Sequence, residues 1–172
     1  MNSMQIQKAV RLWQEYQRVT GTPSGTEGNS VQAEADSQPF QIWGFGDGPP
    51  LADELLELVM NGKKQATAGL FWSYEAEGEA LPTPGDYHVI TDGSNTPRCI
   101  IRTTRVQILP FQEVPEDFAR REGEGDGSLD FWRRVHWEFF TRECRELRRE
   151  PDPTMKVVCQ DFQLVFPIPG IV

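Results

Sequence analysis

Three runs of β-branched and aromatic residues constrain the fold of this chain more than any other feature. They are DYHVIT at 86–91, RCIIRTTRVQIL at 98–109 and VVCQDFQLVF at 157–166, and each shows the partial alternation typical of strands. A turn cluster, TDGSNTPR, joins the first two runs. Because these strands are not separated by regularly alternating helices, we predict an α+β protein with a small closed or half-closed β-barrel and flanking helices.

Three helices are expected beside the strands. The first covers 4–19, where apolar residues recur at helical spacing. The second is LADELLELVMNG, which follows Pro49 and Pro50 and ends at Gly62, a residue that adopts the left-handed C-terminal position without strain. The third spans 129–149, with Ser128 or Asp126 as its N-cap.

The segment between the first helix and the strands predicts a linker. Residues 20–39 are rich in Gly, Ser, Thr and Pro, and such a composition buries too little apolar surface to offset the entropy of ordering. We therefore expect two parts, an N-terminal helix with a flexible linker at 1–39 and a main domain at 40–172. The first helix either packs on the main domain or forms a homodimer contact.

Composition narrows the classes of function. The longest apolar run is far shorter than the roughly 20 residues of a membrane span, and no signal-peptide pattern is present, so we expect a cytoplasmic protein without a membrane partner. The spacing of Cys99, Cys144 and Cys159 fits neither a zinc nor a redox motif. With two histidines in the chain, we expect no metal site and no cofactor.

The adjacent Lys63 and Lys64, followed by Thr67, are the first candidate site. A threonine hydroxyl becomes a nucleophile when a base removes its proton, and a neutral lysine can be that base. Neutrality at pH 7 requires a pKa about three units below normal, a bias on the order of 4 kcal/mol that burial supplies. Neighbouring residues of an extended chain face opposite ways, so Lys63 should face solvent or a phosphate and Lys64 the interior. The alternative is an exposed basic turn.

The second candidate is the acidic segment EGEGDGSLD at 122–130. Glu122, Glu124 and Asp126 alternate with glycines like the start of a calcium loop, but the twelfth position is Arg133 where that loop requires glutamate. One interpretation is a flexible loop entering a helix N-terminus, where carboxylates are electrostatically favoured. The other is that Glu122 enters a pocket and acts as a general acid.

Aromatic and arginine side chains supply candidate binding groups. Phe45, Trp72 and Tyr74 flank the glycine-rich GFGDGPP and the lysine segment and could stack on a nucleobase, although aromatic residues more often form cores. The net charge of −9 repels a polyanion, so RNA contact would need the local group of six arginines between 133 and 149.

Several motifs in order resemble the ASCH (activating-signal-cointegrator homology) domain. They are GKKQAT, LFWSYEAEGEALPTPGDYHVI, FARREGEGDGSLDFWRRVHWEFF and VVCQDFQLVF, and the resemblance covers roughly residues 40–166. It implies a PUA-like fold, a small β-barrel with a cleft associated with RNA.

The resemblance also implies candidate chemistry. Some small members of the family are amidohydrolases that deacetylate 4-acetylcytidine with a lysine, a threonine and a glutamate, which correspond here to Lys64, Thr67 and Glu122. Lys63, Phe45, Trp72, Tyr74 and Glu124 are then expected to bind the substrate. These amidohydrolases carry an arginine two residues after the threonine, where this chain has Gly69. The alternatives are an RNA-binding module and a metal-dependent ribonuclease.

Overall fold

The computed structural model describes residues 2–22 and 39–167, and the chain divides into two compact units. The first unit contains residues 1–60, 85–102 and 164–172, and the second contains 61–84 and 103–163. Most of the predicted linker, residues 23–38, lies outside the described residues. The division into parts 1–39 and 40–172 therefore stays a prediction.

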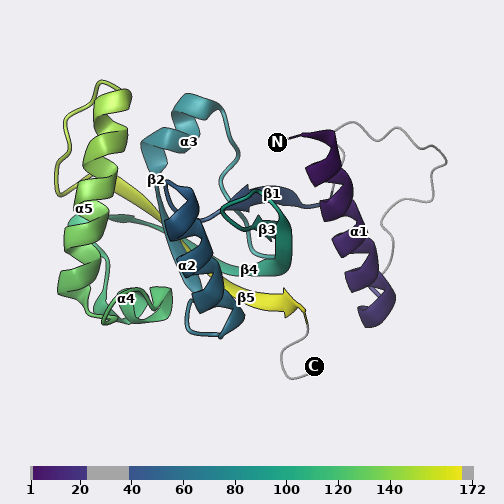
Figure 1. Cartoon of the computed structure of the whole chain (residues 1–172). Coiled ribbons are helices and arrows are strands. Elements are labelled where there is room, and N and C mark those ends of the chain that lie inside the picture. The colour runs from purple at the N-terminus through teal and green to yellow at the C-terminus, as the bar shows by residue number, and fades with distance from the viewer. Residues whose placement is uncertain (1, 23–38, 168–172) are drawn as a thin grey trace. The chain divides into compact units, whose positions relative to one another are not determined.

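The first unit combines helices and strand segments (Figure 1). Its elements are α1 (Ser3–Thr20), β1 (Gln41–Gly44), α2 (Pro49–Met60), β3 (Tyr87–Thr91), the beginning of β4 (Pro97–Pro110) and the end of β5 (Lys156–Phe166). β1 pairs in parallel with β3, and β3 pairs antiparallel with β4. Ala9, Trp13 and Tyr16 of α1 are buried in one core with Val89 and Ile100 of the strands. The apolar face of α1 thus packs against the strands of the same unit. A homodimer contact through this helix stays a prediction.

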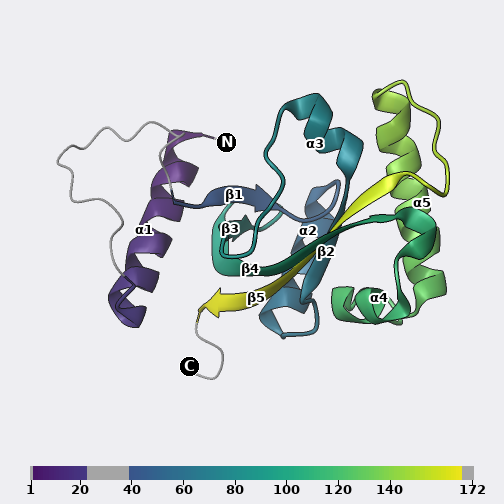
Figure 2. The same cartoon turned by 180° about the vertical axis from the view of Figure 1, so that it is seen from behind.

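The second unit carries the remaining helices and the candidate site. Its elements are β2 (Ala66–Leu70), α3 (Phe71–Glu77), the rest of β4, the 3-10 helix η2 (Phe111–Glu113), α4 (Glu116–Glu122), α5 (Leu129–Glu146) and most of β5. β2 and β5 run side by side as an antiparallel pair (Figure 2). Ala66 and Leu70 of β2 share a core with Trp132, Phe140 and Cys144 of α5.

The hydrogen-bonded strand order is β1-β3-β4-β5-β2, which confirms the predicted α+β class with an N-terminal helix. The three predicted helices and three predicted strands are present, with ends shifted by a few residues. α5 ends at Glu146, three residues early, and Arg148 then adopts a left-handed backbone with φ of 55°. None of the described helices is both long and apolar enough to cross a membrane.

Candidate functional site

Lys64 is the centre of a buried charge cluster in the second unit. It belongs to the chain segment that connects α2 to β2, and only 2% of its surface is exposed. Its Nζ lies 3.2 Å from Oε2 of Glu122 and 2.5 Å from Oε1 of Glu124. Glu122 is 1% exposed, whereas the Glu124 side chain is 16% exposed. Of the two alternatives that the sequence left open for the lysine pair, the structure selects an inward Lys64 beside an exposed Lys63.

A glycine between the two glutamates lets both reach the lysine. Glu122 is the last residue of α4, and Gly123 caps that helix with a φ of 68° in the left-handed region. A Cβ at Gly123 would lie 2.3 Å from the backbone oxygen of Lys63. The backbone N–H of Gln65 donates to the carbonyl of Arg121 at 2.8 Å, which fixes the same junction. The end of α4 and the start of the lysine segment are therefore in backbone contact.

Arg121 holds α4 against the sheet. Its guanidinium donates to Asp161 of β5 at 2.7 Å and also pairs with Asp117 one turn earlier in the helix. The link is partly buried, since Asp161 is 9% exposed. Glu122, the next residue, is thereby held at a fixed place beside β2 and β5.

The protonation states correct the expectation of a neutral lysine. Burial favours the neutral amine, but Glu122 and then Glu124 favour the ammonium, and the net result is a Lys64 pKa above its ordinary value. Burial raises the pKa of Glu122, but Lys64 and several other neighbouring groups oppose it, and the net result is a pKa below its ordinary value. Burial dominates at Glu124 and raises its pKa. In this resting arrangement Lys64 is a cation, Glu122 is a carboxylate, and Glu124 is the glutamate that takes a proton more readily.

His136 joins the cluster from α5, and the sequence analysis did not select it. Its Nε2 lies 3.5 Å from Oε2 of Glu122, and its ring stacks on Trp132 with centroids 4.2 Å apart. The available signal was the four-residue spacing of Trp132 and His136, which places both on one face of a helix. That signal also fits ordinary core packing, because aromatic neighbours surround the histidine in the sequence.

Two buried polar atoms beside the cluster lack a hydrogen-bond partner within the described residues. They are Oε1 of Glu122 and the indole Nε1 of Trp132. The indole lies close enough to lower the pKa of Glu122, although the two do not form a regular hydrogen bond. Buried polar groups are normally satisfied, so these atoms are points where a water molecule or a ligand group would bind.

Thr67 lies in β2, three residues after Lys64. Its strand partner is Gln160 of β5, and its side chain is half-buried. The side chain of Gln160 is buried and donates to the hydroxyl of Thr103 at 2.8 Å. Directly opposed residues of an antiparallel pair project from the same face of the sheet, so Thr67 shares a polar strip with Gln160.

The predicted aromatic residues occupy different places. Trp72 packs against the core of the second unit, with the guanidinium of Arg149 4.6 Å above its ring. Tyr74 is half-buried, and its ring lies where a Cβ on Gly69 would come within 3.0 Å. Phe45 belongs to the first unit, where it is buried and meets the Trp43 ring edge-on at 4.8 Å. Phe45 is therefore a core residue of the first unit.

No group of three or more His, Cys, Asp and Glu residues within 2–22 and 39–167 is arranged to hold a metal ion. The two clustered glutamates form ion pairs with the Lys64 ammonium. The acidic segment that resembles a calcium loop thus provides ion-pair partners for a lysine.

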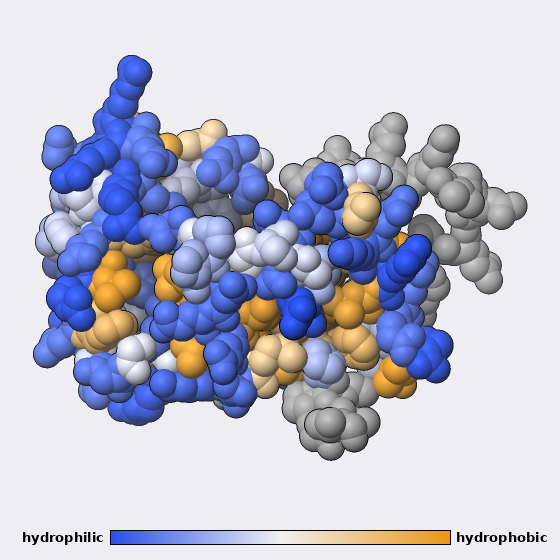
Figure 3. Space-filling view, in the orientation of Figure 1, coloured by the Kyte–Doolittle hydropathy of each residue, from blue (hydrophilic) through white to orange (hydrophobic). Residues whose placement is uncertain are grey.

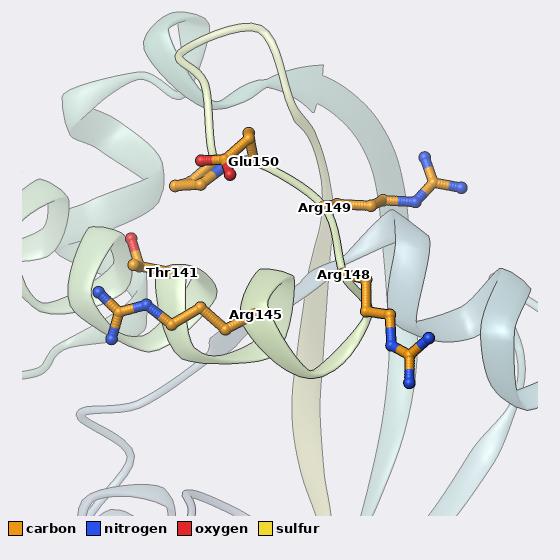
Figure 4. Close-up of a pocket in the computed structure, with 6 residues that line it drawn as sticks. Thr141, Arg145, Arg148, Arg149 and Glu150 are labelled. Carbon is orange, nitrogen blue, oxygen red and sulfur yellow. The ribbon is translucent and has the colours of Figure 1, made fainter.

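A separate pocket of about 460 Å³ opens at the C-terminal end of α5. Its lining is Thr141, Arg145, Arg148, Arg149, Glu150 and Pro151. Thr141 and Arg145 come from the helix, Arg148 and Arg149 from the segment that follows, and the three guanidinium groups point in different directions (Figure 4). The surface over α4 and α5 is largely hydrophilic (Figure 3). Three guanidinium groups that point in different directions fit an extended anion better than a single phosphate.

The model of the ASCH domain family matches residues 41–166. The ASCH domain from Lactobacillus crispatus JV V101 is 30% identical with a TM-score of 0.76, and the match covers 92% of this chain and 94% of that one. Protein EF3133 from Enterococcus faecalis V583 is 32% identical with a TM-score of 0.75, and the match covers 94% of this chain and 91% of that one. No curated protein matches the chain.

Proposed function

Because this chain belongs to the ASCH domain family, which has a PUA-like α+β fold, we propose that it is an amidohydrolase of acylated, 4-acetylcytidine-like nucleosides. Lys64, Thr67 and Glu122 are its proposed catalytic set, and Glu124 is added to them. The observation that carries the proposal is the ammonium shut away from water between two carboxylates. A buried ion pair contributes little net stability, whereas strongly perturbed pKa values cluster at functional sites.

The first proposed step is a proton transfer within the cluster. Lys64 passes a proton to Glu124, to which it is hydrogen-bonded at 2.5 Å, leaving a neutral amine and a neutral carboxylic acid. The raised pKa of Glu124 lowers the cost of this transfer. Glu122 keeps its charge and holds the lysine nitrogen in place. The expected neutral lysine is thus a transient state.

Acyl transfer follows from that state. The neutral amine of Lys64 takes the hydroxyl proton of Thr67 as its oxygen bonds to the acyl carbon. As the C–N bond breaks, Glu124 gives its proton to the departing exocyclic amine, which restores the ammonium and the carboxylate. Water then hydrolyses the acyl-threonine ester. Glu124 replaces Glu122 as the general acid, because Glu124 has the raised pKa and the more exposed side chain.

The direct test is incubation of the protein with 4-acetylcytidine and chromatography of cytidine and acetate. We expect turnover by the wild type, loss of about 100-fold or more in kcat for Thr67→Ala and Glu124→Gln, and partial retention for Thr67→Ser. Lys8→Met, which removes an exposed charge from α1, is the matched control. A folded wild type without turnover contradicts the proposed amidohydrolase activity. Full activity of Thr67→Ala contradicts the role of Thr67 as the nucleophile.

A second candidate function is RNA binding, which the arginine-lined pocket on α5 supports. Guanidinium groups are suited to phosphate, and Arg149 also lies over an aromatic ring. Lys63 is exposed and available for the same purpose. The described structure provides no comparable observation in favour of a metal-dependent ribonuclease.

A further inference from the structure

The hydrogen bonding of His136 determines where its first ring proton lies. Nδ1 is 3.0 Å from the backbone carbonyl oxygen of Trp132, one turn earlier in α5. A carbonyl oxygen only accepts hydrogen bonds, so Nδ1 carries a hydrogen and donates it. In a neutral ring, Nε2 would then have a lone pair and no hydrogen.

An unprotonated Nε2 is unfavourable beside the carboxylate of Glu122. This nitrogen faces Oε2 of Glu122 at 3.5 Å, and that oxygen also accepts from Lys64. A lone pair and a carboxylate oxygen repel each other, so one of them carries a proton. Oε2 accepts from the buried Lys64 ammonium at 3.2 Å, so Glu122 is the ionised partner of that pair. The proton therefore belongs to Nε2, and the ring is an imidazolium.

Charge balance leads to the same assignment. Lys64 alone provides one positive charge against Glu122 and Glu124, which leaves an excess negative charge in a buried place. An imidazolium at His136 gives two positive and two negative groups. Burying uncompensated charge is costly, so the balanced cluster is favoured.

We propose that His136 is a positioning residue that completes this four-group cluster and holds Glu122 between two cations. Its catalytic consequence rests on the proposed function: with His136 charged, Glu122 stays ionised and orients Lys64 for its proton transfers. The groups that face the ring are Glu122 of α4, Glu124 just beyond it and, through Glu122, Lys64. Cys159 of β5 also lies near Glu122, but burial raises its thiol pKa to about 12, so it adds no charge.

The second histidine of the chain is an internal control. Nδ1 of His88 accepts a hydrogen bond from the indole N–H of Trp43 at 3.0 Å. Its hydrogen must therefore lie on Nε2, the reverse of His136, and burial lowers its pKa. The chain has only these two histidines, so a spectrum of imidazole nitrogens contains two rings with predicted opposite states.

The test is ¹⁵N NMR of the histidine side chains at pH 7. We expect one neutral ring protonated on Nε2, assigned to His88, and one ring protonated on both nitrogens, assigned to His136 through the variant His136→Gln. Glu122→Gln should convert the His136 ring to its neutral form and leave His88 unchanged. Two neutral rings in the wild type, or an imidazolium that persists in Glu122→Gln, would overturn the proposal. These readouts do not depend on enzymatic activity.

The catalytic arm compares pH profiles. We expect His136→Gln to lower kcat/KM for 4-acetylcytidine by about 10–100-fold near pH 7 and to change the shape of the pH profile, because the variant lacks the ring that holds Glu122 in place. An equal loss at every pH indicates a merely structural role and contradicts positioning. If the wild type has no turnover, the amidohydrolase proposal fails while the NMR result still decides the protonation state.

Discussion

At the scale of single residues, Lys63 and Lys64 are neighbours in sequence with opposite environments. Lys63 is exposed, whereas Lys64 is buried between two carboxylates. Lys64→Met should lower the free energy of unfolding by about 3–5 kcal/mol, because two buried carboxylates lose their counter-charge. Lys63→Met should change it by less than about 0.5 kcal/mol. Urea denaturation at pH 7 measures both.

The cost of Lys64→Met should also depend on pH. Without the ammonium, the folded-state pKa values of Glu122 and Glu124 rise, so the folded variant binds protons more readily than the unfolded chain. The penalty should therefore shrink as the pH is lowered toward 5. A penalty that is constant between pH 5 and pH 8 would mean that lost packing, not uncompensated charge, is the cause.

Glu143 gives a second pH dependence, away from the cluster. Burial above all, with Glu77 and Glu146, raises its pKa to about 7, while Ser73 opposes the shift. The folded state thus holds this proton more tightly than the unfolded chain, whose value is near 4.5. The contribution of Glu143 to the free energy of unfolding is therefore fully present below pH 4.5 and is lost as the pH rises to about 7. We expect a loss of about 1–2 kcal/mol, reduced by solvent screening.

Glu143→Gln should remove this dependence. Thermal unfolding of the variant between pH 4.5 and 8 should show a flatter profile than the wild type, with a gain in stability at the alkaline end. Glu138→Gln on the exposed face of the same helix is the control and should leave the profile unchanged. Parallel profiles for wild type and Glu143→Gln would show that Glu143 titrates normally.

At the scale of elements, the short helix α4 depends on the glycine that ends it. Gly123→Ala introduces a Cβ 2.3 Å from the Lys63 backbone oxygen as well as a left-handed residue. The backbone conformation alone costs about 1–2 kcal/mol, and the clash should add about 1–3 kcal/mol. The variant should also lose amidohydrolase activity, because Glu122 and Glu124 flank this position.

Gly78 is the matched control for that experiment. It caps α3 with a φ of 67°, almost the same as Gly123, but nothing lies within 4 Å of its Cβ position. Gly78→Ala should therefore show only the conformational cost. Equal unfolding free energies for the two variants would mean that contact between α4 and the lysine segment is not tight.

The elements found from sequence are those with long, regular patterns. α1, α2 and α5 have apolar faces at helical spacing, and β3, β4 and β5 are rich in β-branched residues. The seven-residue helices α3 and α4 were missed, because two turns give too little periodicity and the ends of α4 read as a flexible acidic segment. β2 was left open as a strand or a loop, because ATAGL has one β-branched residue, Thr67, and its strand conformation depends on pairing with β5.

Three of the four residues of the buried charge cluster were predictable from the sequence, but their protonation was not. GKKQAT and the acidic segment identified Lys64, Glu122 and Glu124, yet the charge of Lys64 depends on distances to both glutamates that no local pattern encodes. His136 was missed for a similar reason, since its relation to Glu122 arises only when α4 and α5 pack together. Residue types follow from sequence motifs, whereas their pKa values follow from tertiary contacts.

At the scale of the whole molecule, net charge separates the two candidate functions. A charge of −9 does not repel a neutral nucleoside, but it opposes RNA binding, so RNA affinity must come from a local cationic surface.

If the α5 pocket binds RNA, Arg145→Ala with Arg148→Ala should reduce the slope of log affinity against log salt by about 1–2. Arg11→Ala with Arg18→Ala removes the same charge from the exposed face of α1 and should leave the slope unchanged. Equal losses in the two double variants would assign the affinity to overall charge. A selective loss at α5 would identify a defined phosphate-binding surface.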